Sequence, residues 1–492
     1  MEKKDNIKET NLRSEVISSL IWKFLERIGT QGIQFIVSII LARLLLPSDY
    51  GVISMILVFT AIANVFVQNG FSTALIQKKD ADDCDFSSVF YVSLVIAIVC
   101  YALIYFIAPY VAAFYDMSEI TSILRVISLT LFFGAINSVQ NAKISRDMKF
   151  KKLFFSSLGA IIVSGTTGIT LAYLDYGAWA LVWQQLSNAI ATTIILWFTS
   201  GWKPKLMFSI KKVKKLFSYG WKILCSSLID TIYQNIYNLV IGKFYNSKTL
   251  GNYNKGEQFP KLIAVNVDGA ISSVMLSAYS KEQDSKDKLK KMVRRSIVTS
   301  SLLIFPMMFG LAAVSENVVK ILLTDKWLGC VPYMQLLCIV YALYPINTAN
   351  LQAIKAIGKS DYYLKLEIIK KILGIIVLVC TVRYGVYIMT LGQVGVAIVS
   401  TFINSYPNRK LLDYKYIEQL KDIFPNLIIS IVMFIIVYLF GNINMNIYLL
   451  LGFQILIGIA VYFVLIKLFK LESYDYLIKM IPDRFKIIKR RR

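Results

Sequence analysis

The stretch LARLLLPSDYG (residues 41–51) has a counterpart, IGKFYNSKTLG (residues 241–251), 200 residues further along the chain. In each stretch a long apolar segment ends at one cation, Arg43 or Lys243, the chain turns, and a second apolar segment follows Gly51 or Gly251. A repeat with so long a period indicates a duplicated half-molecule rather than a solenoid. Membrane proteins with such a duplication often form a site between their two halves.

The composition indicates an all-α integral membrane protein. Of the 492 residues, 56% are hydrophobic and 17% are charged, and the mean hydropathy is +0.59. Apolar runs of 18 or more residues recur along the whole chain, and each is long enough to cross about 30 Å of hydrocarbon. The net charge of +24 is explained by cytoplasmic loops that orient the helices, so it does not indicate nucleic acid as a partner.

About fourteen spans are expected, in two pseudo-symmetric six-helix lobes around a central cleft with two further helices. The spans are expected at residues 17–45, 50–76, 87–113, 119–142, 153–174, 177–200, 214–244, 250–278, 294–314, 332–357, 361–384, 386–406, 419–440 and 446–469. Gln140 and Lys143 recur as Gln352 and Lys355, which supports the duplication. The predicted parts are an N-terminal lobe (1–200), a C-terminal lobe (201–412), and two additional spans with a basic tail (413–492).

Basic loops alternate with loops that hold few cations, and this alternation predicts the orientation. Lysine and arginine remain on the cytoplasmic side of a membrane. Both termini are therefore predicted to be cytoplasmic. The basic segments are Lys3 to Arg13, Lys143 to Lys152, Lys203 to Lys215, Lys281 to Arg295, Arg409 to Lys415, and the tail Lys489 to Arg492.

Polar side chains recur every three or four residues in the first, second, seventh and eighth spans, which are the two duplicated hairpins. Side chains at this spacing share one face of a helix, and polar groups within a span usually face an interior or a wet cavity. The sequence thus predicts a shared hydrated cleft. Among the residues expected to line this cleft are Gln31, Gln34, Asn64, Gln68, Gln234 and Asn238.

Charged residues within these spans are candidates for binding ions. Counted from the ends of their spans at about 1.5 Å per residue, Arg27 and Lys261 lie about 15 Å deep. These two cations could together bind an anion. The alternative is that Glu26 neutralises Arg27 and Glu257 neutralises Lys261.

Two acids have a similar choice of roles. Asp230 and Asp268 could bind a coupling cation, or they could pair with Lys222, Lys255 or Lys261.

The sequence contains no complete motif for a nucleotide, metal or catalytic site. The sequence GKS (358–360) resembles the end of a phosphate loop, but Ala353 stands where that motif requires glycine, so a nucleotide site is rejected. Histidine is absent and no C-x-x-C pair occurs, so no zinc site, other metal or cofactor is expected. No catalytic constellation is recognisable, and the chain is not expected to be an enzyme.

Several motifs resemble those of one known family. ISRDMKFKKL (144–153), YGAWALV (176–182) with QQL (184–186), LGNYNK (250–255) and ARLL (42–45) with PSDYG (47–51) occur in the order and spacing of the Wzx-C type of polysaccharide-biosynthesis and O-antigen flippases. This family is part of the multidrug/oligosaccharidyl-lipid/polysaccharide (MOP) exporter superfamily. The similarity extends from about Trp22 to Lys370, and the last hundred residues match in hydrophobicity alone.

The resemblance implies a flippase that moves an undecaprenyl-diphosphate-linked oligosaccharide from the inner to the outer leaflet of the bacterial plasma membrane. It implies that Arg27, Lys255 and Lys261 bind the diphosphate, and that the six cleft residues Gln31, Gln34, Asn64, Gln68, Gln234 and Asn238 bind the sugar. It also implies that a polysaccharide polymerase and glycosyltransferases act in the same pathway. Two alternatives remain. A MATE-like, cation-coupled multidrug antiporter requires an uncompensated acid such as Asp230 or Asp268, and a membrane enzyme requires catalytic residues that the sequence does not show.

Overall fold

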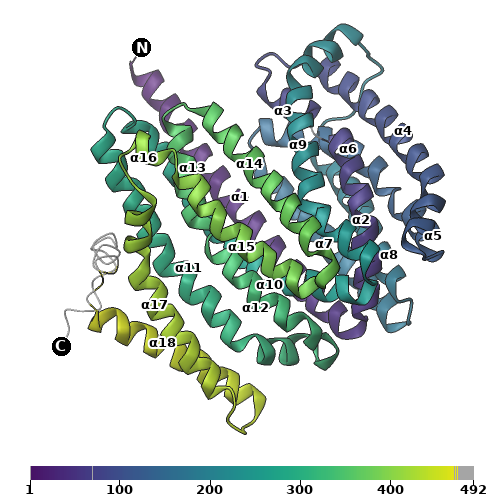
Figure 1. Ribbon diagram of the computed structural model, residues 1–492. Helices are drawn as coiled ribbons and strands as arrows, with labels where there is room; N and C mark the ends of the chain where they lie inside the picture. Colours follow the sequence, from purple (N-terminus) through teal and green to yellow (C-terminus); the bar gives the residue numbers. More distant parts are fainter. Residues whose placement is uncertain (1, 69, 470, 472–473, 475–492) are drawn as a thin grey trace. The chain divides into compact units, whose positions relative to one another are not determined.

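The computed structural model describes residues 2–68, 70–469, 471 and 474, and these residues form helices joined by turns and loops, with no strand among them. The first part of the chain contains nine helices among the described residues (Figure 1). They are α1 (Glu2–Leu44), α2 (Pro47–Gln68), α3 (Phe71–Gln77), α4 (Asp83–Tyr115), α5 (Glu119–Ile127), α6 (Thr130–Arg146), α7 (Phe150–Tyr173), α8 (Ala178–Thr199) and α9 (Ile210–Phe244).

The remaining helices begin with the long α10 (Ser247–Lys281). They continue with α11 (Lys286–Leu323), η1 (Asp325–Cys330), α12 (Val331–Ala342), α13 (Tyr344–Ala356), α14 (Ser360–Thr381), η2 (Val382–Tyr384), α15 (Val386–Ser405), α16 (Asn408–Leu411), α17 (Tyr416–Phe440) and α18 (Ile447–Leu468). The predicted all-α membrane architecture is confirmed.

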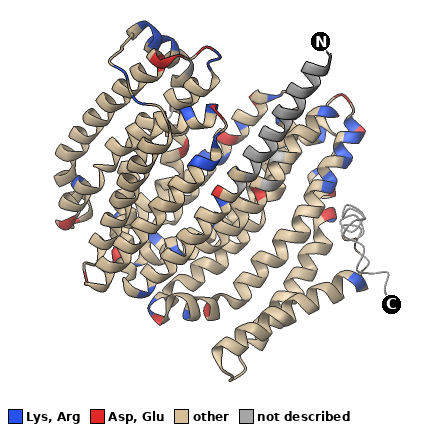
Figure 2. Cartoon of the chain, turned by 180° about the vertical axis from the view of Figure 1, so that it is seen from behind, with Lys and Arg blue, Asp and Glu red and all other residues tan. Residues whose placement is uncertain are grey.

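Each predicted span coincides with one helix or with two helices separated by a short break. Within the described part of the chain, eleven helical segments are long and apolar enough to cross a membrane. Figure 2 shows long stretches of helix without charge, with Lys and Arg concentrated toward helix ends and loops. The chain is therefore a multi-pass membrane protein, and the count of fourteen spans is compatible with the structure.

The breaks within predicted spans have local causes. The second span bends between α2 and α3 at Gly70, whose φ of +90° favours glycine. The tenth span breaks between α12 and α13 at Leu343, just before Pro345, which lacks the N–H that a continuous helix would use. The predicted tight turn before α2 is present, and there the Asp49 carboxylate accepts a hydrogen bond of 2.8 Å from the backbone N–H of Leu46.

Contacts divide the chain into two compact units, residues 1–251 and residues 252–492. In the first unit α7 packs against α1 and α8, α6 against α4, and α9 against α2, α3 and α4. In the second unit α11 packs against α12, α13, α17 and α18, and α15 packs against α12 and α14. The lobe boundaries at residues 200 and 412 were drawn from the sequence repeat and stay a prediction.

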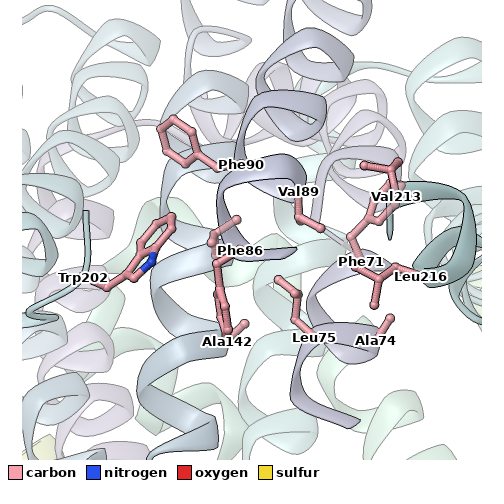
Figure 3. Close-up of a cluster of buried hydrophobic side chains, with 11 residues drawn as sticks. Phe71, Ala74, Leu75, Phe86, Val89, Phe90, Ala142, Trp202, Val213 and Leu216 are labelled. Atoms are coloured by element: carbon pink, nitrogen blue, oxygen red, sulfur yellow. The ribbon is translucent and has the colours of Figure 1, made fainter. Parts of the chain in front are cut away.

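A cluster of buried hydrophobic side chains anchors the segment between α8 and α9 (Figure 3). Trp202 is 5% exposed and lies beside Phe86 and Phe90 of α4, with ring centroids 5.9 and 6.2 Å away. The backbone N–H groups of Lys205 and Ser209 donate hydrogen bonds of 3.0 and 2.9 Å to serine hydroxyls in the first turns of α4. This segment is therefore fixed to the start of α4.

Ion pairs surround the same end of α4. Lys205 pairs with Asp83 and Lys212 pairs with Asp82, each at 2.5 Å. Asp82 also caps α4, because its side chain accepts a hydrogen bond of 2.9 Å from the backbone N–H of Asp85. The predicted basic tail, Lys489 to Arg492, lies outside the described residues, as do the side chains of Lys3 to Arg13.

Candidate functional site

The first unit contains a cavity of about 850 Å³. Nine of its lining residues carry amides and six carry hydroxyls, and none of the twenty-one described lining residues is charged or aromatic. The lining residues are Thr30, Gln34, Val37, Leu57, Thr60, Ala61, Asn64, Gln68, Thr130, Gly134, Asn137, Asn141, Ser157, Ile161, Ser164, Gln184, Gln185, Asn188, Ala189, Thr192 and Asn235.

Helical periodicity places these residues in the cavity wall. Helix α2 contributes five residues, from Leu57 to Gln68, at intervals of one, three or four positions, so they occupy one face. Helices α1, α6, α7 and α8 each contribute a similar stripe, and α9 contributes Asn235. Ile162 and Val163 of α7 are exposed outside the lining, and these apolar side chains suit contact with lipid.

Two amides form an ordered pair on the wall. Gln68 Nε2 donates a hydrogen bond of 3.0 Å to Asn64 Oδ1. Gly134 of α6 faces this pair closely, because a Cβ at Gly134 would lie 2.7 Å from Gln68 Nε2 and 3.1 Å from Asn64 Oδ1. A side chain at residue 134 would therefore displace the pair.

Hydrogen bonds between neighbouring residues also orient other amides of the wall. Asn188 Nδ2 donates to Ser164 Oγ at 3.1 Å, which joins α8 to α7. Asn238 Nδ2 donates to Asn235 Oδ1 at 3.4 Å, within α9. Such contacts hold polar groups toward the cavity and leave further donors and acceptors for a ligand.

The structure brings together three of the six residues predicted to bind sugar. Gln34, Asn64 and Gln68 line the cavity. Gln31 is half-buried and outside the lining, Gln234 is exposed, and Asn238 contacts the lining residue Asn235.

The predicted cation of the first unit lies outside the cavity lining. Arg27 is exposed and stands one helical turn before the lining residue Thr30. Glu26, which the sequence offered as a partner for Arg27, instead forms a 2.9 Å ion pair with Lys23.

In the second unit the two predicted lysines have different surroundings. Lys261 pairs with Glu257 at 3.3 Å, the i,i+4 arrangement named as the alternative, and Glu257 also accepts a hydrogen bond of 2.7 Å from the Tyr341 hydroxyl. Lys255 is 3% exposed, donates a hydrogen bond of 2.9 Å to Gln258 and lies 5.7 Å from the centre of the Trp327 ring. Lys255 is thus covered in this conformation, whereas half of the Lys261 side chain is exposed.

The two candidate acids also differ in exposure. Asp230 of α9 is exposed, and Asp268 of α10 is half-buried near Thr348 of α13. Their predicted role in ion coupling stays a prediction.

Sequence reasoning missed the contributions of α6, α7 and α8 to the cavity. Gln184 and Asn188 are four residues apart, as are Asn137 and Asn141, and that spacing within apolar spans was the available signal. The cleft was instead predicted from the first, second, seventh and eighth spans, which form the duplicated hairpins.

Known structures share this fold. The chain superposes on the lipid II flippase MurJ in its inward closed conformation with a TM-score of 0.75 and 18% identity, over 94% of this chain and 100% of that one. It also superposes on an inward-facing multidrug resistance MATE transporter of the MOP superfamily, with a TM-score of 0.61 and 14% identity, over 80% of this chain and 98% of the other. The chain therefore has the fold of these two membrane transporters, with a polar cavity in its first unit.

Sequence comparison identifies the family of the chain. The family described as "Polysaccharide biosynthesis protein" matches residues 40–332, which is more than half of the chain, and the protein belongs to this family. It is 22% identical to the teichuronic acid biosynthesis protein TuaB of Bacillus subtilis over 71% of this chain and 73% of that protein. It is 21% identical to the lipopolysaccharide biosynthesis protein WzxC of Escherichia coli over 88% of each chain.

Proposed function

We propose that the protein is a flippase that moves undecaprenyl-diphosphate-linked oligosaccharide repeat units from the inner to the outer leaflet of the bacterial plasma membrane. The family membership and the names of the relatives support a role in surface polysaccharide synthesis. The observation that carries the proposal is the amide-lined cavity within a multi-pass membrane protein, because hydroxyl-rich sugars need many hydrogen-bond partners in order to leave water.

In this proposal the parts of the substrate contact different residues. Gln34, Asn64 and Gln68 hydrogen-bond the sugars, and Gln31, Gln234 and Asn238 extend that contact as the substrate moves. The diphosphate is held by Arg27, Lys255 and Lys261. Arg27 and Lys261 are exposed, and Lys255 requires a change of conformation before it is accessible.

The proposed mechanism is alternating access between the predicted lobes (1–200 and 201–412), biased by a membrane potential or by an ion bound at Asp230 or Asp268. Both termini are cytoplasmic in this proposal. Glycosyltransferases of the same pathway would supply the substrate, and a polymerase would consume it. The wall chemistry favours this function over a multidrug antiporter, since none of the described lining residues is an acid that could bind a cationic drug.

The test is a deletion strain complemented with variants. Loss of surface glycan on deletion, restored by the wild-type chain, is expected. The double substitution Arg27→Gln with Lys261→Gln should reduce glycan export at least about tenfold, because each removes a charge-assisted hydrogen bond to the diphosphate. Wild-type export by the double variant would show that Arg27 and Lys261 do not bind the diphosphate. An unchanged surface glycan in the deletion strain would contradict the proposed flippase function.

A further inference from the structure

We propose that the cavity of the first unit is a subsite for uncharged sugar rings and that it excludes sugars bearing a carboxylate. The inference rests on the proposed flippase function and specifies which part of the substrate the cavity accepts. It concerns the ring chemistry of the repeat unit, whereas the diphosphate is assigned to cations outside the lining.

The wall chemistry selects for neutral groups. Each of the nine lining amides carries an N–H₂ donor and a carbonyl acceptor. The six hydroxyls add acceptor oxygens, although those of Thr30, Thr60, Thr130 and Ser164 already donate their proton to a backbone carbonyl three or four residues earlier. Sugar hydroxyls and acetamido groups also donate and accept, so they can pair with such a wall in many orientations. A carboxylate only accepts hydrogen bonds, and it would enter a cavity whose described lining includes no cation.

The same lining argues against recognition by stacking. Aromatic side chains present apolar faces on which rings can lie, and none of the twenty-one described lining residues is aromatic. Selection in this cavity therefore depends on hydrogen bonding and charge. Its volume of about 850 Å³ lies within the range of about 300–1,000 Å³ of small-molecule sites, which suits a short oligosaccharide segment.

Gln68 is the position that best reports this selectivity. Its amide lies in the wall, is exposed, and has a defined partner in Asn64 3.0 Å away. Replacement by Glu or Lys keeps a long flexible side chain and adds one charge to the neutral wall. The sign of that charge should then determine which charged sugar is accepted.

The experiment measures binding of three methyl glycosides to the purified full-length protein in lipid nanodiscs by saturation-transfer NMR. The probes are the neutral methyl N-acetylglucosaminide, the anionic methyl glucuronide and the cationic methyl glucosaminide. The wild-type chain should bind the neutral probe more tightly than either charged probe. Gln68→Lys should strengthen glucuronide binding about tenfold and Gln68→Glu should do the same for glucosaminide, because a hydrogen bond between charged groups is stronger than a neutral one.

The matched controls are Asn442→Lys and Asn442→Asp, which add the same charges at an exposed turn between α17 and α18. They should retain the wild-type order of binding. Equal wild-type binding of glucuronide and the neutral probe, no binding of any probe, or no change of preference in the Gln68 variants would overturn the subsite. The glycan-export assay of the deletion strain tests the flippase function separately, since it does not depend on the order in which the probes bind.

Discussion

Gly51 and Gly251, the two glycines of the 200-residue repeat, lie at a reciprocal backbone contact within residues 1–251. A Cβ at Gly51 would lie 1.8 Å from the carbonyl oxygen of Ser247, and a Cβ at Gly251 would lie 1.9 Å from the carbonyl oxygen of Pro47. Pro47 and Ser247 are themselves 200 residues apart. The duplicated turns therefore meet each other through equivalent atoms, and small residues allow the first turns of α2 and α10 to approach this closely.

Alanine at either glycine should destabilise the fold. The clashing atoms belong to the backbone and cannot turn aside, so Gly51→Ala should lower the free energy of unfolding by about 2 kcal/mol or more. Gly251→Ala should show the same loss because the contact is reciprocal. Thermal unfolding of the purified protein in detergent measures both effects.

The control is Gly395→Ala in α15, where an added Cβ would meet nothing within 4 Å. It should unfold at the wild-type temperature or slightly above it. Wild-type stability of Gly51→Ala would show that the two turns do not meet in the folded protein.

Gly134→Ala should reduce transport while the protein remains folded. The added methyl would meet the end of the Gln68 side chain, which can swing away, so the cost is the Asn64–Gln68 hydrogen bond and part of the cavity rather than the packing of α6. We expect glycan export in a complemented deletion strain to fall about fivefold, as for a mispositioned substrate, with little change in the unfolding temperature.

Gly452→Ala serves as the comparison, since the space around Gly452 of α18 is open. Export by this variant should match the wild-type chain. If Gly134→Ala exports normally, the amide pair does not contribute to substrate binding.

The fold was more accessible from the sequence than the cavity. Apolar runs predict spanning helices because each run must cover its backbone in lipid, and the predicted spans fall on helices throughout. Helical spacing placed Gln34 on the polar face of the first span and Asn64 and Gln68 on the polar face of the second, and all three line the cavity. Spacing cannot say which faces of different helices meet, and for that reason Asn137 and Asn188 were missed.

The partners in ion pairs were also difficult to predict from the sequence. Glu26 lies next to Arg27 in sequence, but neighbouring residues point to different faces of a helix, and Glu26 pairs with Lys23, three positions away. For Lys261 the i,i+4 rule named the observed partner, Glu257. The Tyr341 hydroxyl, which donates a hydrogen bond to Glu257, lies 84 residues further along the chain, and no local pattern in the sequence indicates this contact.

Trp202→Ala should destabilise the first unit. Trp202 is buried against Phe86 and Phe90, and its removal leaves a large cavity in this cluster (Figure 3). The expected loss in the free energy of unfolding is about 3–5 kcal/mol, read from thermal or denaturant unfolding. Trp221→Ala in α9 is the control, because that side chain is 45% exposed and should cost far less. Equal losses for both variants would contradict the burial of Trp202.

The ion pair between Asp82 and Lys212 predicts a pH-dependent contribution to stability. The hydrogen bond from Lys212 holds the pKa of Asp82 below its ordinary value. A carboxyl whose pKa is lower in the folded chain stabilises that chain above the unfolded pKa of about 3.9, and the contribution is lost as the pH falls toward the folded pKa. Asp82→Asn should therefore be less stable than the wild type at pH 7, by less than about 1 kcal/mol because water screens an exposed pair. Since Asn also caps a helix well, the substitution removes the charge and retains the cap.

The difference in unfolding temperature between Asp82→Asn and the wild type should shrink as the pH falls from 5 toward 3 in a series of thermal melts. Lys212→Gln should reproduce the deficit at pH 7, because it removes the partner that favours the ionised carboxyl. The matched control, Asp284→Asn, alters an exposed carboxyl in the turn between α10 and α11 and should melt with the wild type at pH 7. The absence of a deficit in Asp82→Asn at pH 7, or a deficit that stays constant down to pH 3, would show that the ionised carboxylate of Asp82 does not stabilise the fold.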